Sequence, residues 1–152
     1  MKLQTADITF VLIQFVLFFL FIFDISQLQL ELPYIVTLVG LSIAILGSVI
    51  IGIALLQLNK NLSPFPSPKS GSQLIQSGLY KYIRHPIYTG ILFVFSGYSL
   101  YTSSGYKVLI TLLLYILFVF KSRYEEQRLT YTFKNYLRYK KRTGRFLPKI
   151  NR

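Results

Sequence analysis

Residues 33–58 read PYIVTLVGLSIAILGSVIIGIALLQL, an apolar run of 26 residues without a charged side chain. A helix needs about 20 consecutive apolar residues to cross the hydrocarbon core of a membrane. This run is therefore long enough to cross it, and it predicts a transmembrane helix.

Three further apolar segments accompany this run, at residues 8–25, 86–102 and 106–121. The first and the last are near the lower length limit for a transmembrane helix. With 152 residues, 53% hydrophobic side chains and a mean hydropathy of +0.49, the chain is too apolar for an ordinary soluble domain and too short for two domains. We predict an all-α integral membrane protein with about four transmembrane helices, forming one domain over residues 1–152.

The first apolar segment also has the character of a secretory signal peptide, because Lys2 precedes it. Signal peptides end in small residues at a cleavage site. Residues 24–28, which follow the segment, read DISQL and lack such a site. We therefore expect the first segment to be retained as a transmembrane helix.

The basic residues gather on one side of the predicted spans. Of the 17 Lys and Arg, four lie within residues 60–84 and eleven lie from residue 121 onward. Loops rich in Lys and Arg stay on the cytoplasmic side of a membrane. The distribution predicts a multi-pass protein with residues 59–85 and both termini in the cytoplasm.

The C-terminal stretch 121–152 carries much of the net charge of +12, and aromatic residues are interleaved with its Lys and Arg. Such a pattern can bind nucleic acid. Beside a membrane, however, anionic lipid headgroups explain the same composition, and we expect those as partners and no nucleic acid. Residues 122–141 are predicted to form one interfacial amphipathic helix, with its Tyr and Phe toward the membrane or a pocket.

The composition also bears on metal chemistry. The chain has no cysteine, one histidine and five acidic residues. A disulfide framework and a thiolate metal site are therefore excluded, and a zinc site would need mostly carboxylates. We predict no metal.

Small residues recur every four positions in the second apolar segment, at Gly40, Ala44, Ser48 and Gly52. Stripes of small residues allow transmembrane helices to approach closely, so this stripe predicts helix packing. Gly90 in the third segment either belongs to a similar packing face or leaves room for a ligand.

The connection between the second and third segments is rich in proline. Pro64, Pro66 and Pro68 occupy alternate positions, which disfavours both helix and sheet and favours an extended, stiff chain. The connection is either a plain linker or a loop that folds over a site on the cytoplasmic side.

Charged residues and the only histidine meet at the same predicted membrane boundary. Pro86 suits the first position of a helix, so Arg84 and His85 would lie at the positive end of that helix, facing a polar ligand. Glu125 and Glu126 follow the fourth segment on the same side. They either pair with neighbouring Lys and Arg, or one of them binds a cationic ligand beside His85.

Four segments together resemble a known family. Residues 78–90 contain Gly-x-Tyr-x3-Arg-His-Pro-x-Tyr-x-Gly, and residues 125–139 contain Glu-Glu-x2-Leu-x3-Phe-x2-Tyr-x2-Tyr. With segments 61–66 and 142–148, this ordered set resembles the isoprenylcysteine carboxyl methyltransferase and phospholipid methyltransferase superfamily over residues 58–148. The resemblance implies an integral membrane methyltransferase that uses S-adenosylmethionine and acts on a lipidic or lipidated acceptor. It also implies a cofactor pocket formed by Leu74, Ile75, Tyr80, His85, Pro86, Ile87, Tyr88 and Glu125.

The remaining polar residues bear on the methyl acceptor. A carboxylate acceptor needs a cation, for which Arg84, Lys121 and Arg145 are candidates. Lys121 stands where the carboxyl methyltransferase branch of the superfamily has an arginine that contacts the acceptor. An amine acceptor must lose a proton, and His85 and Glu126 are the candidate bases. Both acceptors stay open, and the alternative functions are a non-catalytic lipid- or partner-binding protein of the same fold and a related membrane reductase.

Overall fold

A computed structural model describes residues 4–25, 28–59, 63–68 and 71–149. The predicted all-α class is confirmed, since the described residues form helices and no strand, apart from two isolated bridges. The helices are α1 (Thr5–Ile22), α2 (Tyr34–Leu58), the short 3-10 helix η3 (Gly78–Lys81), α3 (Pro86–Tyr101), α4 (Gly105–Thr132) and α5 (Tyr136–Arg142).

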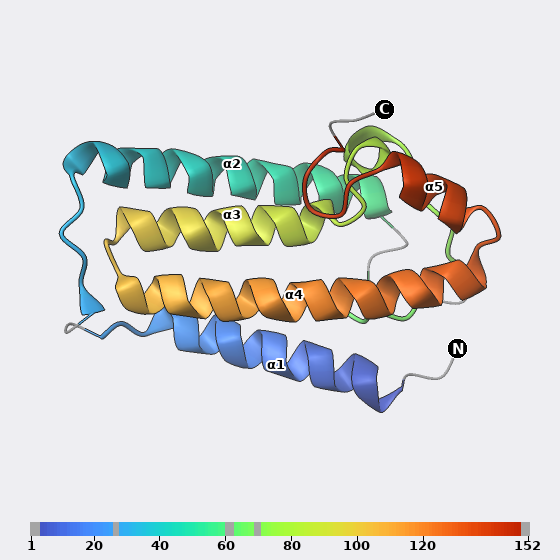
Figure 1. Ribbon diagram of the computed structural model, residues 1–152, viewed down its shortest axis with the longest axis horizontal. Coiled ribbons are helices and arrows are strands. Elements are labelled where there is room, and N and C mark those ends of the chain that lie inside the picture. Colours follow the sequence, from blue (N-terminus) through green and yellow to red (C-terminus); the bar gives the residue numbers. More distant parts are fainter. Residues whose placement is uncertain (1–3, 26–27, 60–62, 69–70, 150–152) are drawn as a thin grey trace.

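The four long helices run side by side, and α3 lies between α2 and α4 (Figure 1). Helix α1 packs on the other side of α4. Phe21 of α1 and Phe118 of α4 belong to the buried core between these two helices. The start of α1 lies at the same end of the bundle as η3 and α5, which we call the polar end (Figure 1).

Within the part of the chain that the structure describes, three helices, α1, α2 and α4, are long and apolar enough to cross a membrane. Helix α3 has 16 residues, which at 1.5 Å per residue is about 24 Å, short of the ~30 Å hydrocarbon core. The prediction of four crossings therefore stays a prediction. Two helices differ clearly from their predicted bounds: the first begins at Thr5 and ends at Ile22, and the fourth continues to Thr132.

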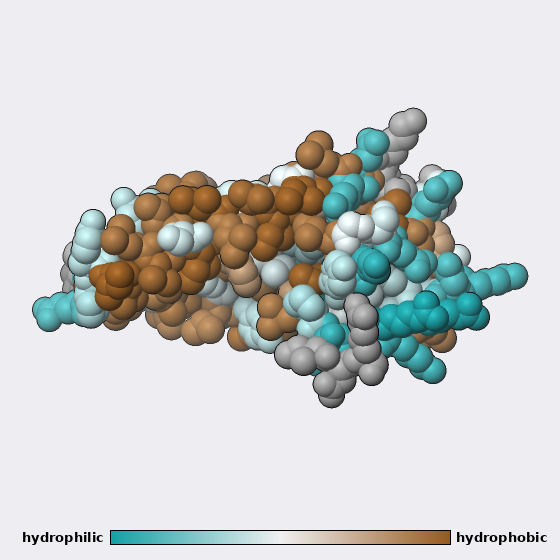
Figure 2. Space-filling model, turned by 90° about the horizontal axis from the view of Figure 1, so that it is seen from above, coloured by the Kyte–Doolittle hydropathy of each residue, from teal (hydrophilic) through white to brown (hydrophobic). Residues whose placement is uncertain are grey.

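The surface of the bundle suits a membrane. Figure 2 shows hydrophobic residues covering most of the visible length of the bundle, while hydrophilic residues gather at the polar end. Large apolar side chains such as Phe19 and Leu56 are 59% and 81% exposed. An apolar surface of this extent requires a lipid environment, so the chain is a membrane protein.

Glycines allow α2 and α3 to approach closely. A Cβ atom added to Gly97 would lie 2.5 Å from the backbone of both Gly40 and Ala44, and one added to Gly90 would lie 2.8 Å from the Gly47 carbonyl. Neither position has room for a side chain. Gly90 therefore belongs to a packing face, and the alternative of a ligand space beside it is wrong.

The predicted stripe of small residues is only half correct. Gly40 and Ala44 pack against α3, but Ser48 is exposed and a Cβ on Gly52 would meet nothing within 4 Å. A helix turns by 100° per residue, so a four-residue spacing drifts about 40° at each step and leaves the contact face. The face that packs continues through Gly47 instead.

The prediction that residues 122–141 form one continuous helix is wrong, and their placement at the membrane interface stays a prediction. Residues 122–132 continue α4 without a break, because this stretch contains neither Gly nor Pro. The helix ends at Phe133, whose backbone is extended, and α5 begins three residues later. Helix α5 buries Tyr136 and Tyr139 toward a cavity, so the aromatic residues on this helix face the protein interior.

Candidate functional site

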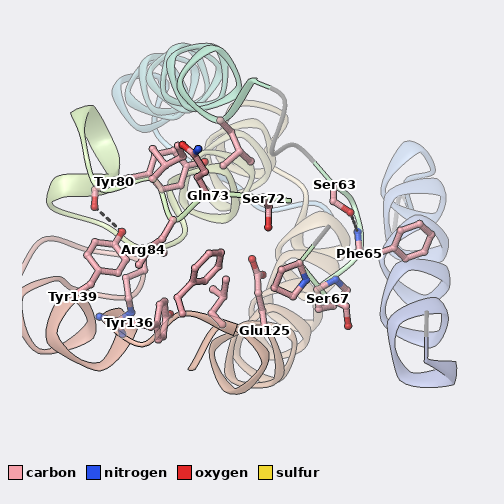
Figure 3. A pocket seen from close by; sticks show the side chains of 17 residues that line it. Ser63, Phe65, Ser67, Ser72, Gln73, Tyr80, Arg84, Glu125, Tyr136 and Tyr139 are labelled. Atoms are coloured by element: carbon pink, nitrogen blue, oxygen red, sulfur yellow. Dashed lines mark hydrogen bonds between the residues drawn. The ribbon is translucent and has the colours of Figure 1, made fainter. Parts of the chain in front are cut away.

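A cavity of about 110 Å³ lies at the polar end, between the proline-rich loop and the end of α4 (Figure 3). Residues 63–68 form one wall, and residues 72–75 with Tyr80 form a second. Arg84 and Glu125 supply charged groups. The apolar part of the lining includes Leu58, Leu74, Ile75, Leu129 and Phe133.

Glu125 is the carboxylate of this cavity. Its side chain is 26% exposed, and in Figure 3 it points toward Ser72 across the cavity. The Tyr88 hydroxyl donates a hydrogen bond to Glu125 Oε2 at 2.9 Å, and His85 Nδ1 lies 3.6 Å from the same oxygen. The rings of His85 and Tyr88 are parallel, with centroids 5.3 Å apart.

The position of His85 follows from the start of α3. Pro86 occupies the first turn of the helix, where its missing N–H needs no partner, and His85 precedes it as the N-cap residue. Tyr88 therefore lies within the same turn as Pro86, which brings its ring beside that of His85 and its hydroxyl to Glu125.

Glu126 is buried, with only 1% of its side chain exposed, and cations surround it. Its carboxylate lies 3.0 Å from Arg84 Nε, 2.9 Å from Lys140 Nζ and 3.1 Å from Arg145 Nε. His85 Nε2 lies 3.4 Å away. A carboxylate held by three cations is a poor proton acceptor, so its surroundings suit a structural ion-pair centre better than a general base.

Backbone pairing joins the C-terminal segment to the start of α3. The amides of Arg84 and His85 donate to the carbonyls of Gly144 and Arg145 at 2.9 and 3.1 Å, and the Gly144 amide donates to the Tyr82 carbonyl. The Arg84 guanidinium also donates to the Thr143 carbonyl. These bonds place the cations of residues 140–145 around Glu126.

The proline-rich loop is fastened to α1. The buried carboxylate of Asp7 accepts hydrogen bonds from the Ser67 amide at 3.1 Å and from the Ser67 hydroxyl at 2.8 Å. Lys121 of α4 donates to the Pro64 carbonyl at 3.1 Å and to Gln14 Oε1 at 2.6 Å. The loop therefore folds over the site, which is one of the two alternatives that the sequence left open.

Tyrosines close the cavity near α5. The Tyr139 hydroxyl donates to the Tyr80 carbonyl at 2.6 Å. Burial raises the pKa of Tyr80, Tyr136 and Tyr139 well above the usual range, so all three are neutral phenols at physiological pH. Within the described part of the chain, the buried hydroxyls of Ser72 and Tyr136 have no hydrogen-bond partner. Both residues line the cavity.

A model of the phospholipid methyltransferase family matches residues 35–136. The chain belongs to the phospholipid methyltransferase family. The resemblance seen in the sequence is confirmed, and the protein is a membrane methyltransferase by family. A search of curated proteins found no match.

The family match begins at the second residue of α2 and ends at the first residue of α5. Several side chains that hold the site together lie outside the matched range. Asp7 and Gln14 on α1 bind the loop and Lys121, and Lys140 and Arg145 pair with Glu126. This member of the family therefore uses residues on both sides of the matched range to build the site.

The structure brings the predicted site residues to one end of the bundle but gives them different surroundings. Five of them line the cavity: Leu74, Ile75, Tyr80, Arg84 and Glu125. The others lie outside its lining: His85, Pro86, Ile87 and Tyr88 at the start of α3, and Lys121, Glu126 and Arg145 in the contacts described above.

Sequence reasoning did not assign several polar residues of this site, among them Tyr136, Ser72 and Asp7. Tyr136 and Ser72 were passed over because tyrosine and serine are common beside membranes and in loops. Asp7 carried a usable signal, since an acidic residue at the start of an apolar helix has a partner as a rule. That partner, Ser67, is 60 residues away, and nothing in the sequence around it indicates the contact.

Proposed function

We propose that the protein transfers a methyl group from S-adenosylmethionine to a lipidic or lipidated acceptor at the polar end of the bundle. The observation that carries this proposal is the Glu125 carboxylate on the wall of a partly apolar cavity, in a chain of the phospholipid methyltransferase family. The cofactor supplies a methyl group on a positively charged sulfur. A carboxylate is a suitable neighbour for that charge and for the ammonium group of the cofactor.

The residues around Glu125 fit such a ligand. Tyr88 orients the carboxylate through its hydroxyl, and His85 lies against the same oxygen. The partnerless hydroxyls of Ser72 and Tyr136 are available to polar groups of the ligand, because buried hydroxyls otherwise lose hydrogen bonds. Leu74 and Ile75 offer apolar surface for a flat ring.

The cavity has a smaller volume than a pocket that holds a complete cofactor. Its volume of about 110 Å³ is below the ~300–1,000 Å³ of pockets for drug-sized ligands. The loop over residues 63–68 is the wall that can yield, since it is held by hydrogen bonds that Ser67 donates to the Asp7 carboxylate and that Lys121 donates to the Pro64 carbonyl. We propose that this loop shifts outward when the cofactor enters and returns to exclude water.

Catalysis in this proposal comes mainly from positioning. Holding the methyl donor and the acceptor in line converts a bimolecular step into an effectively unimolecular one. A lipidic acceptor reaches the polar end by diffusing within the membrane. The proposal covers carboxylate and amine acceptors, and analysis of the methylated product distinguishes them.

The test is equilibrium binding of radiolabelled S-adenosylmethionine to the purified protein in nanodiscs. We expect saturable binding that S-adenosylhomocysteine displaces, and at least a tenfold loss of affinity in Glu125→Gln, because a hydrogen bond to a charged group contributes about 1.5–3 kcal/mol. Glu31→Gln is the matched control, since Glu31 is an exposed carboxylate in the α1–α2 connection.

Equal affinity in both variants would overturn the assignment of Glu125. No binding by a folded sample would overturn the methyltransferase proposal itself and favour the membrane reductase, for which nicotinamide oxidation is the assay. Cofactor binding without methyl transfer to any lipid fraction would favour the non-catalytic alternative.

We further propose that the polar end faces the cytoplasm, because most Lys and Arg lie there. The chain has no cysteine, so single cysteines report their side of the membrane without background. In intact cells we expect an impermeant maleimide to label Glu31→Cys and to leave Lys149→Cys unlabelled until the membrane is opened. The reverse pattern would contradict the orientation.

A further inference from the structure

A second concave surface lies on the outer side of α5, apart from the cavity around Glu125. This basic groove, about 820 Å³, runs between η3, α5 and the C-terminal segment. No carboxylate is among the described residues that line it. Five cations line it: Lys81, Arg138, Lys141, Arg142 and Lys149.

Among the described residues, no carboxylate neutralises the charges of the groove. Glu126 pairs with Arg84, Lys140 and Arg145, none of which lines the groove. Within the described ranges, no carboxylate lies within 4.0 Å of any of the five groove cations. Five like charges on one concave surface repel each other and attract an anion.

Hydrogen bonds hold the sides of the groove in place. Tyr139 lies between the groove and the cavity, and its hydroxyl is bonded to the Tyr80 carbonyl. The Gly144 amide donates to the Tyr82 carbonyl at 3.0 Å, which joins two of the groove's sides. Lys149 Nζ donates to the Lys141 carbonyl at 3.0 Å, so the last described residue is also held against α5.

The position of the groove indicates what it binds. It lies at the polar end, where the apolar surface of the bundle gives way to hydrophilic residues (Figure 2). Phosphate groups of phospholipids are concentrated at this level of a membrane, and each Lys or Arg near an anionic surface adds about 1 kcal/mol of attraction. Tyr82, which is 49% exposed, adds an amphipathic ring typical of the interface.

We propose that the basic groove binds the phosphate headgroup of an anionic phospholipid, at a site separate from the methyl-transfer cavity. The proposal does not depend on the cofactor or on the methyl acceptor. It assigns this lipid to a discrete surface between η3 and α5 instead of to the whole basic stretch of residues 121–152.

The test compares two double variants that remove the same charge. Arg138→Gln with Lys141→Gln neutralises two exposed groove cations, and Arg123→Gln with Lys134→Gln neutralises two exposed cations outside the groove. Native mass spectrometry of the full chain in neutral detergent measures binding of short-chain phosphatidylglycerol, with short-chain phosphatidylcholine as the neutral lipid. Inorganic phosphate and a single-stranded RNA are added as competitors.

We expect saturable binding of phosphatidylglycerol that is about thirtyfold weaker in the groove variant, at about fivefold per cation. The control variant should change affinity by less than threefold. Equal losses in the two variants would overturn the discrete site.

The competitors separate the sources of the anion. Displacement of phosphatidylglycerol by equimolar inorganic phosphate would assign the groove to a free phosphate compound and overturn the lipid assignment. If equimolar RNA displaces phosphatidylglycerol from the native chain, and this effect of RNA is lost in the groove variant, the groove would be assigned to nucleic acid. Normal thermal unfolding of both variants ensures that a loss of binding reports the groove.

Discussion

Glu125 and Glu126 are neighbours on α4, yet their surroundings assign them different tasks. The helix turns by about 100° between them. One carboxylate therefore reaches the cavity and receives the Tyr88 hydroxyl, while the other turns toward Arg84 and the C-terminal segment. We infer that the first is responsible for binding and the second for holding the site together.

This division predicts losses of stability of different size for Glu126→Gln and Glu125→Gln. Glu126→Gln leaves Arg84, Lys140 and Arg145 close together without a counter-charge, and breaking a buried ion pair costs about 3–5 kcal/mol. We expect a clearly lower melting temperature in detergent. Glu125→Gln should reduce stability by about 1 kcal/mol, because its carboxylate accepts a single hydrogen bond within the described residues. Equal melting temperatures would contradict the assignment.

At the scale of elements, α2 and α3 form the most closely packed pair of helices. Apolar lipid gives helices no hydrophobic reason to associate, so close backbone approach through glycine provides the attraction. Gly40 and Gly97 face each other, and so do Gly47 and Gly90. This pairing holds the start of α3, and therefore His85, at a fixed height relative to α2.

The two kinds of glycine on these helices give a matched pair of variants. Gly97→Ala places a Cβ 2.5 Å from the α2 backbone, so the helices must separate, at a cost of about 1–3 kcal/mol. Gly52→Ala meets open space and gains about 0.5–1 kcal/mol of helix propensity. Chemical unfolding in detergent should therefore show changes of opposite sign. A loss of similar size in both variants would mean that the two helices do not pack as described.

At the scale of the whole molecule, ion pairs fasten the bundle at both ends. Opposite the polar end, Lys107 Nζ lies 2.7 Å from Asp24 Oδ2, and the Ser104 hydroxyl donates to Asp24 Oδ1. These contacts join the end of α1 to the start of α4. Glu126 has the corresponding role at the polar end, where it joins α4 to the C-terminal segment.

The pair at the far end predicts a dependence of stability on pH. The hydrogen bond from Lys107 lowers the pKa of Asp24 to about 2, from an ordinary value of 3.8. A carboxyl group whose pKa is lower in the folded state stabilises the fold above its unfolded pKa, and that contribution disappears as the pH falls through the folded value. We expect the difference in unfolding free energy between the native chain and Asp24→Asn to be full at pH 7. It should vanish between pH 4 and 2, and a difference that is constant over this range would contradict the assignment.

The sequence predicted the large features of this molecule and missed those that depend on long-range contacts. Apolar runs locate the long helices because lipid leaves the backbone few choices. Of the eight residues predicted to form the cofactor pocket, Leu74, Ile75, Tyr80 and Glu125 line one cavity, and their role in binding the cofactor stays a prediction. The sequence could not distinguish the roles of Glu125 and Glu126. The two residues are identical neighbours, and they differ only in the residues that they contact in the folded protein. The contact between Asp7 and Ser67 was hidden for the same reason.

Packing of α1 against α4 has a consequence for the order in which the protein is made. Phe21 and Phe118 share one core, but nearly a hundred residues separate them in synthesis, which is roughly 5–20 s at ~5–20 residues per second. During that interval α1 contacts lipid in the bilayer, because α4, the helix on which it packs, has not yet been synthesised. Lys140 and Arg145 emerge later still, so the surroundings of Glu126 are completed only after these two residues have been synthesised.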